Sequence, residues 1–82
     1  MNIVIYTRPG CKYCSQVKEL MERAEFEYEE RYITTPDQRE QFLTEHPDAK
    51  TYPYVIIDGE HTGGLVETAK LFVQNGWVRA KN

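Results

Sequence analysis

Apolar residues fall first into a short continuous run and then into a helical repeat. Residues 3–6 are β-forming without alternation, which is typical of a strand covered on both faces, and the turn-prone Arg8-Pro9-Gly10 follows. From Cys11 onward, apolar side chains recur at helical spacing with charged residues between them, up to Ala24. The pattern predicts a central strand followed by an amphipathic helix.

The middle of the chain predicts a second strand and a second helix. Residues 26–33 mix aromatic and β-forming side chains with acidic ones, which indicates a strand with a weaker signal. Thr35 is a predicted N-cap, because Pro36 suits the first helical position and Gln38 completes a capping box. This helix should end near His46, just before a proline.

The last third predicts a hairpin and a third helix. Residues 54–57 form another apolar run, and Asp58-Gly59 is a turn that leads into a short fourth strand around residues 61–62. Beyond Gly63-Gly64, residues 65–73 again show apolar helical spacing, and Gly76 sits where a C-terminal cap glycine is common.

The predicted order is β-α-β-α-β-β-α, an α/β fold in one domain over residues 1–82. A helical crossover makes the first two strands parallel, and the hairpin makes the last two antiparallel. We therefore expect a mixed four-stranded sheet with three helices covering both faces.

Composition and charge narrow the class of protein. The net charge is -3 and the ten basic residues are scattered, so we expect no nucleic-acid partner. The first residues lack the basic region and cleavage site of a signal peptide, and no segment has the length of a membrane span. We expect a cytoplasmic protein with no membrane partner, in a compartment that keeps most thiols reduced.

The chemistry-bearing motif is Cys11-Lys12-Tyr13-Cys14, directly after the first strand and at the start of the first helix. Unpaired N–H groups and the helix dipole at this position stabilise an anion, so the thiolate of Cys11 is favoured. Arg8 and Lys12 add positive charge. Cys14 shares a helix face with apolar residues and should be more buried, which predicts that Cys11 attacks and Cys14 resolves.

Two other interpretations of the cysteine pair are weaker. A structural disulfide that closes so short a loop gains only roughly 2 kcal/mol. A structural zinc site needs four ligands, and His46 and His61 lack zinc-finger spacing from the cysteines, so we predict no metal. Both histidines are predicted to be surface residues.

Three separated motifs carry a resemblance to one family: Tyr6-Thr7 followed after three residues by Cys11-X-Tyr13-Cys14, then Thr51-Tyr52-Pro53, and Gly63-Gly64. With them the chain resembles a dithiol glutaredoxin along nearly its whole length. The resemblance implies a thioredoxin-like fold with glutathione as the reducing co-substrate. It also implies a cis Pro53 that faces the dithiol.

The resemblance further implies a glutathione site. Tyr52 would pair its main chain with the tripeptide, the helix start behind Gly64 would receive the γ-glutamyl carboxylate, and Glu67 would hold the γ-glutamyl ammonium. Arg8 and Arg39 would hold the glycyl carboxylate. The full set implied is Arg8, Lys12, Tyr13, Arg39, Thr51, Tyr52, Pro53, Gly64, Leu65, Val66 and Glu67.

The activity implied is a glutathione-dependent thiol–disulfide oxidoreductase, expected to be monomeric, that reduces protein disulfides and glutathione mixed disulfides. Cys11 and Cys14 would be its catalytic residues. One alternative is a redoxin that thioredoxin reductase reduces and that serves ribonucleotide reductase. Another is a non-enzymatic iron–sulfur carrier, which the second cysteine argues against.

Overall fold

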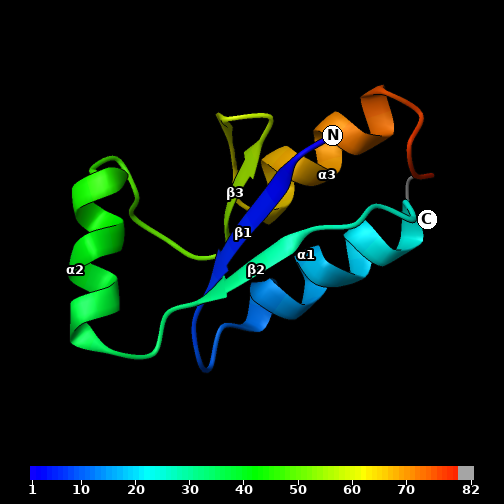
Figure 1. Cartoon of the computed structure of the whole chain (residues 1–82). Helices are drawn as coiled ribbons and strands as arrows, with labels where there is room; N and C mark the ends of the chain where they lie inside the picture. The colour runs from blue at the N-terminus through cyan, green and yellow to red at the C-terminus, as the bar shows by residue number, and fades with distance from the viewer. Residues whose placement is uncertain (80–82) are drawn as a thin grey trace.

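The computed structural model describes residues 1–79 and has the element order predicted from the sequence (Figure 1). The elements are β1 (Ile3–Thr7), α1 (Lys12–Arg23), β2 (Glu29–Tyr32), α2 (Pro36–Glu45), β3 (Tyr54–Ile57), β4 (Glu60–Gly63) and α3 (Leu65–Gln74). The strands form one sheet in the order β2-β1-β3-β4, with β1 parallel to β2 and antiparallel to β3, and β3 antiparallel to β4. The predicted mixed sheet is confirmed.

The sheet separates two hydrophobic cores, because successive side chains of a strand point to opposite faces. On one face Ile3, Ile5 and Val55 pack against α1 and α3, whose side chains Met21 and Phe72 are fully buried. Figure 1 shows α1 and α3 together on this side and α2 apart on the other.

The second core lies between the sheet and α2. It contains Tyr6 from β1, Tyr54 from β3 and Phe42 from α2. Phe42 is the only buried side chain of α2, so this helix is attached to the sheet by one aromatic anchor. The ring centroids of Tyr6 and Phe42 lie 4.4 Å apart, in a tilted arrangement that suits two aromatic quadrupoles.

The helix ends follow the predicted capping chemistry. The Thr35 side chain accepts a hydrogen bond from the Gln38 N–H, and the Gln38 side chain accepts from the Thr35 N–H, which confirms the capping box. Gly76 follows α3 with a φ of +71°, the left-handed conformation of a C-terminal cap glycine. Nowhere in residues 1–79 is a helix both long and apolar enough to cross a bilayer.

The second predicted strand was too long. The second strand is only Glu29–Tyr32 and is exposed along its whole length, because it is a sheet edge and the preceding Phe26 packs on the core from outside the strand. Val66 and Val73 follow the helical spacing of α3 yet are exposed, and the polar Thr68 is buried instead.

His46 also departs from its prediction. It is half-buried, because the end of α2 places its ring beside those of Tyr6, Phe42 and Tyr54. His61 is exposed, as predicted.

Candidate active site

The two cysteines lie at the start of α1, after the turn that follows β1. Cys11 is the N-cap of α1, with extended backbone angles and no acidic residue in the first helical turn, so the helix start faces no competing anion. Its sulfur is bonded to that of Cys14, with the two Cα atoms 5.4 Å apart. Cys11 is half-buried, whereas Cys14 is 4% exposed. The predicted difference in exposure is confirmed.

A cation is held next to the dithiol by an aromatic ring. The Arg8 guanidinium carbon lies 5.3 Å from the centre of the Tyr52 ring, a cation–π contact. The Tyr52 ring in turn packs on that of Phe42 at 5.6 Å. The Cys11 N–H donates to the Arg8 carbonyl at 3.4 Å, so the turn before α1 is tied both to the cysteine and, through Tyr52, to α2.

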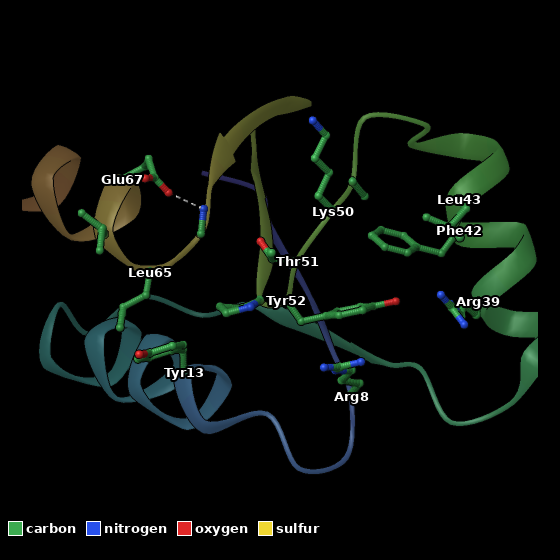
Figure 2. A pocket seen from close by; sticks show the side chains of 14 residues that line it. Arg8, Tyr13, Arg39, Phe42, Leu43, Lys50, Thr51, Tyr52, Leu65 and Glu67 are labelled. Carbon is green, nitrogen blue, oxygen red and sulfur yellow. Dashed lines mark hydrogen bonds between the residues drawn. The ribbon is translucent and has the colours of Figure 1, made fainter.

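A pocket of about 680 Å³ opens beside this turn, and of the Cys11-to-Cys14 motif only Tyr13 lines it (Figure 2). We call it the dithiol pocket for its place next to this turn. Its volume lies in the range of small-molecule sites, roughly 300–1,000 Å³. The structure brings ten of the predicted glutathione residues together around it: Arg8, Tyr13, Arg39, Thr51, Tyr52, Pro53, Gly64, Leu65, Val66 and Glu67. Lys12, the eleventh, is exposed and does not line the pocket. The binding roles of these residues stay predictions.

Four lining residues were missed from the sequence: Phe42, Leu43, Ala49 and Lys50. Phe42 and Leu43 lie three and four positions after Arg39 on α2, so they share a helix face with it, and this spacing could have found them. Lys50 is a charged residue that lines the same pocket. Its position directly before Thr51-Tyr52-Pro53 could have indicated this from the sequence.

The Tyr52–Pro53 peptide bond is cis, as the resemblance implied. Pro53 is buried and Tyr52 is half-buried, and both residues line the pocket. This places the segment that precedes β3 between the dithiol turn and the start of α3.

The start of α3 forms the opposite end of the pocket. Glu67 Oε1 accepts the Gly64 N–H at 2.8 Å, and this hydrogen bond, with that of its own N–H, holds the pKa of Glu67 below its usual value. The capping leaves the first-turn N–H groups of Leu65 and Val66 without an intrahelical acceptor. Figure 2 shows Glu67 at one end of the pocket and Arg39 at the other, with Arg8 beneath Tyr52.

A polar network lies behind the dithiol turn. Thr7, 1% exposed at the end of β1, donates to Glu30 Oε2 at 2.7 Å, and Lys18 of α1 reaches the same oxygen at 3.1 Å. The hydrogen bond from Thr7, followed by that from Lys18, lowers the pKa of Glu30 against the opposing effect of partial burial. The network joins β1, α1 and the edge strand β2 next to the cysteines.

A second network anchors the loop between α2 and β3. The Tyr54 hydroxyl donates to Asp48 Oδ1 at 3.0 Å, and His61 Nδ1 lies 3.2 Å from Asp48 Oδ2. The rings of Tyr54 and His61 stack at 3.8 Å. Burial, and then Asp48, raises the pKa of Tyr54 to about 12. This loop carries Lys50 and Thr51 into the dithiol pocket.

A metal would need a cluster of ligands. Within the part of the chain that the structure describes, no three His, Cys, Asp or Glu side chains are placed so that they could share an ion.

Comparison with known proteins defines the class. The glutaredoxin family model matches residues 3–62, so the chain belongs to the glutaredoxin family. Glutaredoxin 1 of Rickettsia conorii is 34% identical over 65 residues, which are 77% of this chain and 64% of that protein. The match therefore spans somewhat less than two thirds of that relative's length.

Solved structures agree with the fold. Glutaredoxin 1 from Francisella tularensis, crystallised with cacodylate, superposes with a TM-score of 0.77 at 32% identity, covering 90% of this chain and 93% of the other. A buckwheat glutaredoxin–glutathione complex gives a TM-score of 0.70 at 26% identity, covering 93% and 71%. The fold is the thioredoxin-like fold of glutaredoxins, with Cys11 and Cys14 at the Cys-X-X-Cys spacing.

Proposed function

We propose that this protein is a thiol–disulfide oxidoreductase that uses glutathione as its reductant. The observation that carries the proposal is the arrangement of charge in the dithiol pocket. Arg39 lies at one end, the start of α3 with Glu67 lies at the other, and Arg8 beneath Tyr52 and Lys50 above Thr51 add positive charge between them. A ligand that fits needs a carboxylate at one end and an amino-acid zwitterion at the other, and glutathione has both.

The α3 end suits the zwitterion. The first-turn N–H groups of Leu65 and Val66 would donate hydrogen bonds to the γ-glutamyl carboxylate, because a helix start favours an anion. The Glu67 carboxylate, whose lowered pKa keeps it ionised at neutral pH, would attract the ammonium group of the same residue. The buckwheat glutaredoxin–glutathione complex supports this choice of ligand by family likeness.

The chemistry follows from the exposure of the two sulfurs. In the reduced protein the Cys11 thiolate would attack a disulfide and form a mixed disulfide, with the departing sulfur leaving as a thiolate. Cys14, buried behind it, would then attack the Cys11 sulfur and release protein substrates, whereas glutathione would resolve a glutathionylated enzyme. Glutathione reduces the resulting Cys11–Cys14 disulfide and closes the cycle.

A coupled assay tests the proposal. With glutathione, glutathione reductase and NADPH, the wild type should turn over both a glutathionylated peptide and a protein disulfide. Cys11→Ser should abolish both reactions, whereas Cys14→Ser should keep the first and lose the second. Equal loss of both activities in Cys14→Ser would contradict the roles assigned to the two sulfurs.

A binding variant separates glutathione from other reductants. Glu67→Gln should raise the KM for glutathione with little change in kcat, because it weakens a contact made equally in ground and transition states. Glu22→Gln, on the exposed surface of α1, removes the same charge outside the pocket and is the control. Turnover sustained by thioredoxin reductase but not by glutathione would overturn the proposed reductant.

A further inference from the structure

A second groove continues from the dithiol pocket along α2, and we call it the α2 groove. Its walls are residues 33–36, Pro9 of the dithiol turn, and the α2 side chains Glu40 and Thr44. Four residues line both hollows: Arg8, Arg39, Leu43 and Tyr52. The Arg8–Tyr52 pair, joined by the cation–π contact, therefore lies where the two hollows meet.

Two of the four shared residues are arginines, and we call the place where they line both hollows the Arg8–Arg39 junction. Within residues 1–79, neither Arg8 nor Arg39 forms an ion pair with a carboxylate, although the chain carries a net charge of -3. Arg31, in contrast, is paired with Glu29. Two guanidinium groups that line the same two hollows and are not ion-paired with a carboxylate favour an anionic ligand.

The main chain of the groove offers little to a ligand. The Ile33 N–H donates to the Thr7 carbonyl, and the N–H groups of Thr34 and Thr35 both donate to Gln38 Oε1. Pro9 and Pro36 have no N–H. A peptide cannot add to this segment as a strand through these donors, so recognition must rely on the arginine side chains and on apolar contact with Ile33, Pro36 and Leu43.

We infer that the α2 groove binds the polypeptide of a protein disulfide substrate and that the Arg8–Arg39 junction selects substrates with a carboxylate beside the reacting cysteine. The inference rests on the dithiol exchange proposed above, but not on glutathione as reductant. When a protein disulfide is attacked the dithiol pocket holds no glutathione, and the junction is free for a substrate side chain. Glu40, which follows Arg39 on α2 and also lines the groove, limits the preference because it repels the same carboxylate.

The reaction that reports on this preference needs only the reduced protein. The Cys11 thiolate attacks one sulfur of a cyclic peptide disulfide, the peptide S–S bond breaks, and the departing sulfur takes up a proton. Cys14 then loses its proton and attacks the Cys11 sulfur, which releases the second peptide thiol. One peptide disulfide and one protein dithiol become one peptide dithiol and one Cys11–Cys14 disulfide.

Two peptides that differ only by Asp or Asn next to the reacting cysteine test the inference in single-turnover reactions, quenched by alkylation and analysed by mass. The Asp peptide should react about two- to fivefold faster at low salt, the range expected from solvent-exposed ion pairs. The difference should vanish at about 1 M salt, where screening acts over about 3 Å.

Three variants locate the effect. Arg39→Gln should bring the Asp/Asn rate ratio close to one, whereas Arg23→Gln, at the far end of α1, removes the same charge and should leave the ratio unchanged. Glu40→Gln should raise the ratio. Equal rates for the two peptides in the wild type, or equal effects of Arg39→Gln and Arg23→Gln, would overturn the inference alone, whereas failure to reduce either peptide would overturn the proposed dithiol exchange as well.

Discussion

A substitution at Gly63 should affect both the stability of the fold and the position of Glu67 in the dithiol pocket. Gly63 ends β4 with a φ of +125°, a conformation that side chains rarely adopt, and a Cβ built there would lie 2.7 Å from Glu67 Cβ and 2.9 Å from Glu67 Cγ. Gly59, in the turn directly before β4, has a φ of +82° and nothing within 4 Å of its Cβ position. A comparison of Gly59→Ala with Gly63→Ala therefore distinguishes the free-energy cost of a positive φ from the cost of a clash with Glu67.

The expected costs follow from these two terms. A side chain in the left-handed region costs about 1–2 kcal/mol, which applies to both Gly59→Ala and Gly63→Ala. Overpacking adds about 1–3 kcal/mol at Gly63 only, because the neighbouring Glu67 Cβ belongs to a helix and cannot rotate away. Gly63→Ala should therefore unfold at a lower urea concentration than Gly59→Ala, with an unchanged denaturant slope.

The same substitution should reach the dithiol pocket. Moving Glu67 breaks its hydrogen bond to the Gly64 N–H, so Gly63→Ala should raise the KM for glutathione, whereas Gly59→Ala should not. The reasoning is refuted if the two variants lose equal free energy of unfolding, or if Gly63→Ala is destabilised with its KM unchanged.

Two further predictions concern the polar networks. Because the pKa of Glu30 is lowered in the fold, its contribution, about 1 kcal/mol for its hydrogen bonds, is present above its ordinary pKa of 4.5 and is lost as the pH falls. The free energy of unfolding of the wild type should thus exceed that of Glu30→Gln at neutral pH and lose this excess as the pH falls below the ordinary pKa of 4.5. A difference that stays constant with pH would contradict the assignment. In a spectrophotometric titration, the tyrosine that ionises near pH 12 should disappear in Tyr54→Phe and shift to lower pH in Asp48→Asn, and a late step that persists in Tyr54→Phe would refute its origin.

Local signals in the sequence were sufficient for most of the fold. Thr35, Pro36 and Gln38 marked the start of α2 by capping chemistry alone, and this mattered because a helix with one buried residue has almost no apolar repeat. The parallel pairing of β1 with β2 followed from the helical crossover between them, and the antiparallel pairing of β3 with β4 followed from the short turn that joins them. The edge strand β2 was placed too broadly, because exposure at a sheet edge removes the alternation that defines a strand.

The site was predictable only where chemistry and sequence adjacency coincide. Cys11 and Cys14 could be assigned from their position after a strand and at a helix start, and their relative exposure from the helix face. The contact between Arg8 and Tyr52 could not, because it joins two loops that only the tertiary fold brings together. The contact between Asp48 and His61 could not be predicted either, because the pairing of β3 with β4 brings His61 close to the loop that precedes β3.

The central claim is that the start of α1 holds Cys11 as a thiolate. Absorbance of the reduced protein at the thiolate band, followed across pH, tests it most directly. The account predicts an ionisation step below the ordinary thiol pKa of about 8.5 that is present in Cys14→Ser and absent from Cys11→Ser. A Cys11 step at or above that pH, or an early step that survives in Cys11→Ser, would contradict it.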